Sequence, residues 1–388
     1  MKVLLTGAAW QPALASLRNL GEAGARVDVI GGRLEQCLHS RYCCNRLFYS
    51  DPKKSPEKYL EQLYALVSQE RYDALLPCDE HSAVLLSGQL ERFQRFIPLP
   101  VPSSTRMTAA RDKAQLLKIA QKLGLDVPQS FQPSGSEDLK RLSQKVTYPC
   151  VIKPRRSMAA VGLRYADSPE ALLELYAANP QPTDPHFDFS NPLVQEFIPG
   201  QIHDVCALFN HGEPRAVLTQ KRLFMYPARG GRGIECETTR EPQIEEKAIT
   251  LLRQLRWHGP AQVEFKHDPR DGVFKLMEIN PRFWGTLELS ICAGIPFPLL
   301  TCQMLMKGDI EPVSDYKVGL RFRWLIPYIL PRFFQSKRKL RFLLYLVRRE
   351  RRVLNEVRIT DPLPHLVHPI YLLSRKMASA HRRFWESI

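Results

Sequence analysis

Short apolar runs alternate with amphipathic stretches along the first hundred residues. Apolar residues with a helical spacing occupy positions 12–20 and the segment after Ser55, which precedes a proline at the first helical position. Between these stretches, strands are predicted at residues 3–6, 27–30 and 74–76. Strands that alternate with helices are typical of βαβ units, so the pattern predicts a parallel sheet.

This first segment is Rossmann-like by its pattern. Its first turn, residues 7–12, lacks the Gly-x-Gly-x-x-Gly spacing that lets a backbone approach a pyrophosphate, which disfavours a dinucleotide-dependent enzyme. A proline-rich stretch at residues 97–104 then predicts a linker that ends the segment.

The region after this stretch mixes helices with strands that follow one another. Asp112 is predicted to cap a helix that Gly124 ends, since Gln115 follows the Asp by three residues and glycine is a common helix stop. A helix with apolar positions from 244 to 255 is predicted later in the chain. Strands are predicted at residues 150–153, 193–195, 204–209, 215–219, 262–266 and 273–279, with loops at 154–160 and 229–233.

The last two of these strands carry the most informative polar residues. A short turn at residues 268–272 would place Glu264 and Glu278 side by side, with Asn280 on the same face two residues further on. Two carboxylates and an amide suit Mg²⁺, which shares its coordination with substrate phosphates. Arg282 would add a fork of donors for a phosphoryl oxygen. The alternative is a hairpin whose exposed face simply carries charges, and the hairpin alone does not decide between them.

The order of these elements resembles the ATP-grasp superfamily over about residues 1–310, and within it the carboxylate–amine ligases and the carbamoyl-phosphate-synthase-like enzymes. The resemblance is found at Arg111-Asp112-Lys113, at residues 148–154, at residues 194–200 and at the Asn280-Pro281-Arg282 sequence. One departure concerns the loop after Lys153, which has a single glycine where the family has several. Such a loop closes over the triphosphate with its backbone amides, so a stiffer and more cationic lid is expected.

The resemblance also implies roles for individual residues. Arg282, Lys153 and Arg229 are the expected catalytic residues. Nucleotide contacts are expected from Lys113, Lys153, Ser157, Gln195, Glu196, Phe197, Ile198, Asp204 and Lys221, with the adenine edge met near Glu196 and Ile198 and the ribose near Asp204. The metal ligands are expected to be Glu264, Glu278 and Asn280.

The implied fold combines α/β and α+β parts. A Rossmann-like domain is expected at residues 1–105, and a two-lobed ATP-grasp domain follows. Its central lobe with the phosphate lid is expected at 106–192 and its C-terminal lobe with the magnesium site at 193–312. A basic, helical extension is expected at 313–388.

The implied reaction is the ATP-dependent activation of a small carboxylate as an acyl phosphate, which an amine then attacks, with ATP and Mg²⁺ (Mn²⁺ as a substitute) as cofactors. A different class of function stays open: an ATP-binding, membrane-associated scaffold without turnover. A bicarbonate-phosphorylating synthase is weakened by the single ATP-grasp unit and the lack of a glutaminase segment.

Positive charge is concentrated at one end of this 388-residue chain, whose formal net charge is +15. Residues 321–388 contain sixteen Lys and Arg but four Asp and Glu, with aromatic residues between them. Two interpretations stay open: an amphipathic segment on an anionic membrane surface, or a helical cap on the catalytic lobe. Nucleic acid is not expected as a partner, because no recognised binding motif is present, and a homodimer is compatible with the pattern.

The nine cysteines are scattered without a Cys-x-x-Cys pair, which disfavours a disulfide framework or a thiolate zinc site. No apolar run approaches the ~18–20 residues that span a bilayer. A cytoplasmic protein is expected, peripheral on the inner face of the membrane if the basic segment binds lipid.

Overall fold

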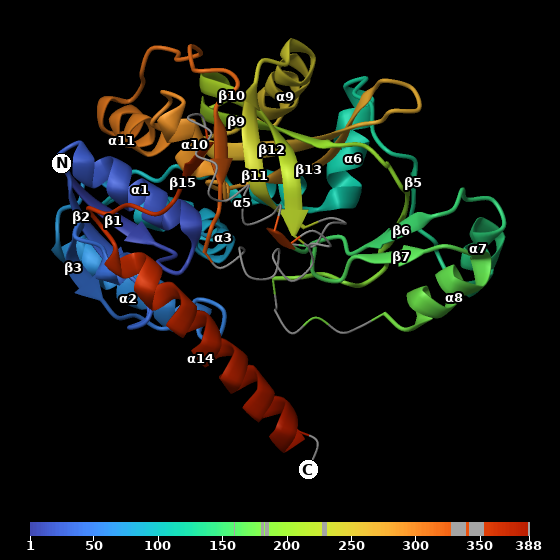
Figure 1. Ribbon diagram of the computed structural model, residues 1–388, viewed down its shortest axis with the longest axis horizontal. Coiled ribbons are helices and arrows are strands. Elements are labelled where there is room, and N and C mark those ends of the chain that lie inside the picture. The colour runs from blue at the N-terminus through green and yellow to red at the C-terminus, as the bar shows by residue number, and fades with distance from the viewer. Residues whose placement is uncertain are drawn as a thin grey trace.

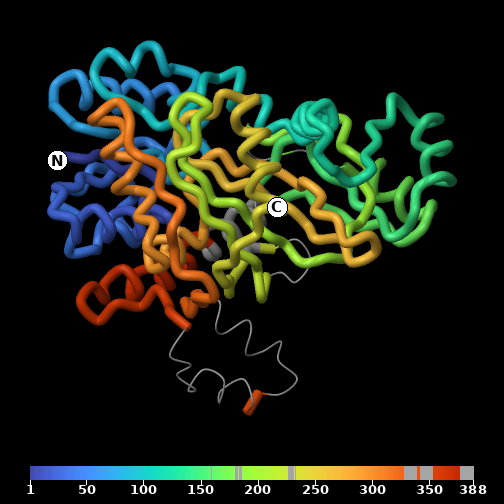
Figure 2. The backbone as a smooth tube through the Cα atoms, turned by 90° about the horizontal axis from the view of Figure 1, so that it is seen from above, coloured from blue at the N-terminus to red at the C-terminus, as the bar shows by residue number. Residues whose placement is uncertain are grey.

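Three β-sheets form the framework of the protein (Figure 1). The computed structural model describes residues 1–158, 160–179, 182, 186–226, 231–326, 339–340 and 353–386. The N-terminal sheet and the small sheet lie on opposite sides of the large, seven-stranded sheet, and the view from above in Figure 2 shows the same arrangement.

The N-terminal sheet has the order β3-β2-β1-β4 and is parallel throughout, as the alternating pattern predicts. The small sheet has the order β5-β8-β6-β7 and is antiparallel, and the large sheet has the order β13-β12-β9-β10-β11-β14-β15. Their strands are β1 (Lys2–Thr6), β2 (Arg26–Ile30), β3 (Cys43–Leu47), β4 (Ala74–Pro77), β5 (Ser130–Phe131), β6 (Cys150–Lys153), β7 (Arg164–Ala166), β8 (Leu193–Glu196), β9 (Ile202–Asn210), β10 (Glu213–Tyr226), β11 (Arg232–Thr239), β12 (Gly259–His267), β13 (Phe274–Asn280), β14 (Arg321–Arg323) and β15 (Val353–Asn355).

Helices connect and cover these sheets. In the part of the chain that the structure describes they are α1 (Gln11–Glu22), η1 (Gln36–His39), α2 (Pro56–Gln69), α3 (Glu80–Gly88), α4 (Leu90–Phe93), α5 (Ser104–Arg111), α6 (Lys113–Lys122), α7 (Ser136–Ser143), α8 (Pro169–Ala177), α9 (Pro242–Gln254), α10 (Leu287–Cys292), α11 (Phe297–Lys307) and α14 (Leu363–Glu386). The predicted cap of α6 is confirmed, because the Asp112 carboxylate accepts from the backbone N–H groups of Ala114 and Gln115. Without such a cap these donors would lack an intrahelical partner.

The large sheet separates two apolar cores because adjacent strand residues point to opposite faces. Val205, Ala207 and Phe209 of β9 pack with α9. Cys206 and Leu208 face the other way, into a core that also contains residues of β1, α1 and α11. The N-terminal sheet therefore shares its core with the large sheet, and its separation as a domain at residues 1–105 stays a prediction.

The proline-rich stretch that the sequence predicts as a linker is buried in the structure. Ile97, Leu99 and Val101 are buried in one cluster with residues of α2 and β4. The carbonyl of Pro100 also lies so close to Gly259 that a Cβ there would stand 1.9 Å from its oxygen. The proline-rich stretch therefore passes through a buried part of the protein, in close contact with the start of β12.

The basic extension begins differently from what the sequence predicts. Residues 321–323 form β14, which pairs with β11. The sequence predicts a glycine loop at residues 229–233 but does not predict β11. Arg321 and Arg323 form ion pairs with Glu237 and Glu235, and Phe322 is fully buried. This part belongs to the large sheet because its alternating Arg and aromatic residues have partners on both faces.

The remainder of the described extension contains β15 and α14. α14 packs on η1 near its N-terminus and then projects beyond the rest of the molecule (Figure 1). Among the described residues, no helix has the length and apolar character needed to cross a membrane. Residues 327–338 and 341–352, which carry much of the predicted basic segment, lie outside the described part of the chain.

Candidate active site

A row of polar residues crosses four strands of the large sheet. Glu278 of β13 pairs with Glu264 of β12, Glu264 pairs with Asp204 of β9, and Asp204 pairs with Gln220 of β10. Residues that pair directly across strands share a face of the sheet. The predicted adjacency of Glu264 and Glu278 is confirmed by this register, which adds a third carboxylate beside them.

Arg222 neutralises the inner part of this row. Its guanidinium donates to both carboxylate oxygens of Asp204, at 3.0 Å and 2.7 Å, and also forms an ion pair with Glu264. Gln220 donates to Asp204 as well, at 3.0 Å. Asp204 is fully buried and does not line the cavity described below, so the structure does not bring it to the position expected of a ribose ligand.

Two lysines face the outer end of the row. Lys113 Nζ lies 3.4 Å from Glu278 Oε2. Burial alone would raise the pKa of Glu278, but Lys113 and Lys153 outweigh it and hold this pKa below its usual value. Burial lowers the pKa of Lys153 to about 8, although Glu278 opposes the shift. The outer carboxylate is therefore held ionised beside two cationic groups.

Glu264 has a different environment from its neighbour. Burial raises its pKa to about 7, and Glu278 and Asp204 add to this rise while Arg222 opposes it. Asn280 Nδ2 donates to Glu264 Oε1 at 2.8 Å. The pKa values of the two adjacent carboxylates thus shift in opposite directions: two lysines outweigh burial at Glu278, whereas at Glu264 burial and two neighbouring carboxylates outweigh Arg222.

A single cavity collects most of the predicted residues. The residues predicted from the sequence that line it are Lys113, Lys153, Ser157, Gln195, Glu196, Phe197, Ile198, Glu264, Glu278, Asn280 and Arg282. They lie on α6, on strands of the small and large sheets, and on the residues that follow those strands, which the chain brings together from positions 113 to 282. Arg229 lies outside the described residues.

Besides Asp204, Lys221 is the predicted residue among the described ones that does not line the cavity. Its Nζ lies 3.1 Å from Glu237 Oε1 of the neighbouring strand β11. Because successive strand residues point to opposite faces, Arg222 rather than Lys221 faces the carboxylate row.

The loop after Lys153 is held at the N-terminus of α6. The backbone N–H of Lys113 donates to the carbonyl of Arg155 at 3.0 Å, and the Lys113 ammonium donates to the carbonyl of Ser157 at 3.4 Å. The Arg155 guanidinium forms an ion pair with Asp112, the cap of the same helix. The Arg155 side chain and two backbone carbonyls of this loop thus tether it to the helix that carries Lys113.

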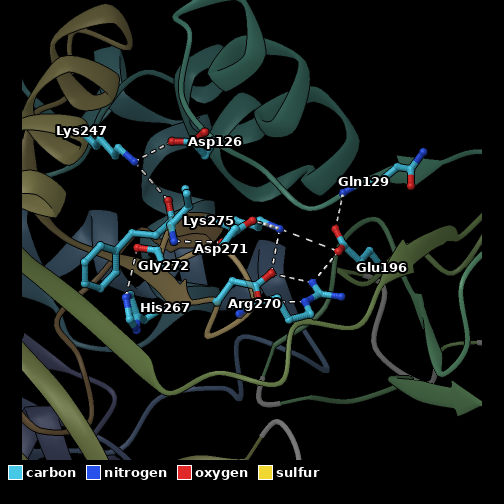
Figure 3. A network of polar contacts seen from close by, with 12 residues as sticks. Asp126, Gln129, Glu196, Lys247, His267, Arg270, Asp271, Gly272 and Lys275 are labelled. Atoms are coloured by element: carbon cyan, nitrogen blue, oxygen red, sulfur yellow. Dashed lines mark hydrogen bonds and ion pairs between the residues drawn. The ribbon is translucent and has the colours of Figure 1, made fainter.

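The end of β8 joins the small sheet to the large one, as Figure 3 shows in close-up. The Glu196 carboxylate accepts from the backbone N–H of Gln129 at 3.2 Å and forms an ion pair with Arg270 in the turn between β12 and β13. Lys275 lies 3.8 Å from the same carboxylate. The Glu196 side chain thus contacts this turn.

Arg282 is positioned by groups from two parts of the protein. It donates to Asn280 Oδ1 at 3.2 Å and to the carbonyl of Phe283 at 3.0 Å. Its Nε lies 3.8 Å from Glu80 Oε2 of α3, and the other oxygen of Glu80 accepts from Arg111 at 2.8 Å. Glu80 is buried, so it links helices α3 and α5 to the end of β13.

Sequence reasoning missed several residues of the cavity wall. Gln262 and Lys266 lie two residues on either side of Glu264, so period-two alternation could have placed them on its face. Lys266 donates to the carbonyl of Ile198 at 2.7 Å. Others come from distant elements and carry no local signal: Trp10, Gln11, Pro12, Cys78, Arg222 and Trp324.

The donor set fits Mg²⁺ and a triphosphate. Glu264, Glu278 and Asn280 offer oxygen ligands, and the lysines beside them offer charge for phosphates. Within the described ranges, no three His, Cys, Asp or Glu side chains gather closely enough to hold a metal ion alone. This is the situation that Mg²⁺ tolerates, because it retains waters and shares substrate oxygens.

Comparison with known sequences identifies relatives of this arrangement. A sequence model of the family described as "ATP-grasp in the biosynthetic pathway with Ter operon" matches residues 188–326. The carbamoyl phosphate synthase large chain of Vibrio cholerae is 24% identical over 315 residues, which cover 73% of this chain and 28% of that protein. The homologous chain of Pseudomonas syringae is 25% identical over 316 residues, with 73% and 29% covered. The chain thus spans a little over a quarter of the length of these relatives.

Solved structures share the fold at lower identity. Biotin carboxylase from Campylobacter jejuni, in a β,γ-ATP complex, superposes with a TM-score of 0.68 at 16% identity, covering 82% of this chain and 74% of that one. L-amino acid ligase from Bacillus licheniformis has a TM-score of 0.61 at 17% identity, with 80% and 75% covered. N5-carboxyaminoimidazole synthetase from Staphylococcus aureus, complexed with ADP, has a TM-score of 0.63 at 15% identity, with 82% and 80% covered.

Proposed function

We propose that this chain is a member of the ATP-grasp superfamily and acts as an ATP-dependent ligase that joins a small carboxylate to an amine. The carboxylate oxygen would attack the γ-phosphorus of ATP and form an acyl phosphate, and ADP would leave. The amine nitrogen would then attack the acyl carbon, lose a proton and displace phosphate. The observation that carries this proposal is the cavity in which Lys113, Lys153 and Arg282 surround a carboxylate row that fits Mg²⁺.

Phosphate binding is assigned to the two lysines. Lys113 is held by the backbone of the Arg155 loop, and Lys153 ends β6 in the same cavity. Their charges would gather the triphosphate and stabilise the transferring group, which is most of what phosphoryl transfer requires of a protein. Mg²⁺ held by Glu264, Glu278 and Asn280 would neutralise phosphate charge during the transfer.

The adenine is assigned to residues 195–198 at the end of β8, which line the same cavity as Ser157 of the tethered loop. Lys266 donates to the Ile198 carbonyl, which fixes this backbone before a base arrives. The ribose is not assigned to Asp204, because Arg222 already takes both of its carboxylate oxygens.

Arg282 is assigned to the reacting carboxylate or acyl phosphate. Its planar fork of donors matches such groups, and Asn280 and Glu80 restrict its orientation. Arg229 is proposed for the same task from the resemblance to the family alone.

Bicarbonate is the second candidate for the acid. The observation that favours it is the sequence similarity to carbamoyl phosphate synthase, which extends over 73% of this chain. The L-amino acid ligase that shares the fold favours an organic acid instead. A scaffold that binds ATP without turnover is disfavoured, because it would need neither both carboxylates nor Arg282.

The test is ADP release by the full chain with Mg-ATP and a panel of organic acids, bicarbonate and amines. At least one pair should release ADP above the ATP-only background. Glu278→Ala should lower that rate about 100-fold or more, since a group that stabilises transition-state charge is lost, while its melting temperature stays near that of the parent.

Glu137→Ala is the matched control, because Glu137 is an exposed carboxylate that pairs only with Lys140 among the described contacts. It should release ADP at the parental rate. The proposal is wrong if no pair of substrates stimulates ADP release, or if Glu278→Ala retains full turnover.

A further inference from the structure

The outer face of α14 carries a stripe of exposed apolar residues. Leu363, Leu366, Ile370 and Leu373 follow one another at three- and four-residue intervals and are 55%, 64%, 55% and 60% exposed. Ile359, just before the helix, is 94% exposed. Residues at this spacing lie along one side of a helix, so Leu363, Leu366, Ile370 and Leu373, here named the α14 stripe, form one continuous apolar surface.

The opposite face of the same helix is packed on the protein. Pro364, His365 and His368 are buried. Arg18 of α1 contacts His365 Nε2 at 2.9 Å and donates to Asp361 Oδ2 at 2.9 Å. Because these contacts fix one face of α14 against the protein, the α14 stripe stays on the opposite, solvent-exposed face.

The segment before the helix is anchored as firmly. The Glu356 carboxylate accepts from the backbone N–H groups of Leu325 and Ile326, and Arg358 forms ion pairs with Glu22 and Glu288. Asp361 also accepts from Ser40 Oγ at 2.8 Å. The α14 stripe is therefore presented by a fixed structure.

The charge of this region distinguishes two possible partners of the α14 stripe, a second copy of the chain and a negatively charged surface. Residues 321–388 contain sixteen Lys and Arg but four acidic residues, and four of the cations belong to α14 itself: Arg375, Lys376, Arg382 and Arg383. A second copy paired through the same face would bring two such cationic segments together, and like charges oppose that pairing. A negatively charged surface is complementary to them.

We propose that the α14 stripe docks this protein on an anionic phospholipid surface. Apolar side chains on one face of a helix that also carries Lys and Arg are the features of helices that lie in the membrane interface. Beyond the turns that pack on η1, the helix projects from the body (Figure 1).

The test is co-sedimentation of the full chain with vesicles of phosphatidylcholine alone or mixed with phosphatidylglycerol. We expect the protein to sediment with the mixed vesicles and to remain in solution with the neutral ones. The variant Leu366→Glu/Ile370→Glu/Leu373→Glu should lose at least 10-fold in bound fraction at limiting lipid. All three positions are exposed, so its thermal unfolding should match that of the parent.

Met306→Glu/Val318→Glu is the matched control, because these residues are 51% and 55% exposed and lie outside α14. It should bind the mixed vesicles as the parent does. The proposal is overturned if the parent stays in solution with both kinds of vesicle, or if the triple variant sediments like the parent. It is also overturned if the parent is a dimer that the triple variant converts to monomers. No outcome depends on ligase turnover.

Discussion

Glu264 and Glu278 are directly paired on neighbouring strands, yet their pKa values are shifted in opposite directions. Lys113 and Lys153 lower the pKa of Glu278, whereas burial and two neighbouring carboxylates raise the pKa of Glu264. Three carboxylates in one row would repel one another strongly in a buried setting. Arg222 offsets this repulsion, because its guanidinium forms ion pairs with both Asp204 and Glu264.

We predict that Arg222→Gln costs about 3–5 kcal/mol of unfolding free energy, the range for breaking a buried ion pair. The removal leaves Asp204 and Glu264 without a compensating charge. Denaturant unfolding measures the loss, and Arg253→Gln is the control, since it removes a pair that is more than half exposed and should cost less than about 1 kcal/mol. Equal unfolding midpoints for the two variants would contradict this assignment.

At the scale of elements, one of the contacts that attach α14 requires a neutral histidine. Arginine can only donate, so His365 Nε2 must accept the contact from Arg18, which requires an unprotonated nitrogen. Burial lowers the pKa of His365 to about 4, Arg18 adds to the shift, and Asp361 opposes it. The docking of the helix is thus linked to pH.

The sign of this linkage follows from the lowered pKa. Between the usual histidine pKa of about 6.5 and the folded value of about 4, the unfolded state binds more protons at this site, so stability falls as the pH falls through that window. We predict a loss of up to about 3 kcal/mol from this group. It should be absent above pH 7.

His365→Gln should flatten this part of the pH profile, because its amide does not titrate. Unfolding free energies of parent and variant between pH 7 and pH 4 measure the difference. His203 and His258 have similarly lowered pKa values and remain in both proteins, so only the difference reports on His365. Parallel profiles would show that the helix attachment does not titrate.

At the scale of the whole molecule, the cavity depends on parts that are distant in the sequence. One apolar core joins the N-terminal sheet to the large sheet, while the small sheet has its own core around Ile152 and Leu172. The ion pairs at Glu196 and Arg270 connect these two bodies (Figure 3). The link from the N-terminal part to the chemistry is Glu80, beside Arg282.

We predict that Glu80→Gln lowers kcat about 10- to 100-fold, the effect of a misplaced catalytic group. The KM for ATP should change little, because Glu80 itself does not line the cavity. Steady-state ADP release measures both. Glu61→Gln is the control, since Glu61 pairs with Arg92 at an exposed position of the same N-terminal part. Parental kcat in Glu80→Gln would exclude a positioning role.

Local patterns in the sequence were sufficient to predict the hairpin of β12 and β13. The strands around Glu264 and Glu278, the turn between them and the cap at Asp112 all depend on residues within a few positions of one another, where period and capping rules act. The order of several such motifs was sufficient for the ATP-grasp resemblance.

Tertiary structure alone decided which neighbouring residues face the site. Arg222 rather than Lys221 meets the carboxylate row, and Asp204 becomes its buried partner, because the register of β9, β10 and β12 sets the facing side chains. It also placed Trp10, Cys78 and Trp324 on the cavity wall and residues 321–323 in a sheet. These outcomes depend on contacts between strands that lie from 16 to more than 80 positions apart in the sequence, such as Asp204 with Gln220 and Glu235 with Arg323, and a local pattern of apolar and polar residues does not encode them.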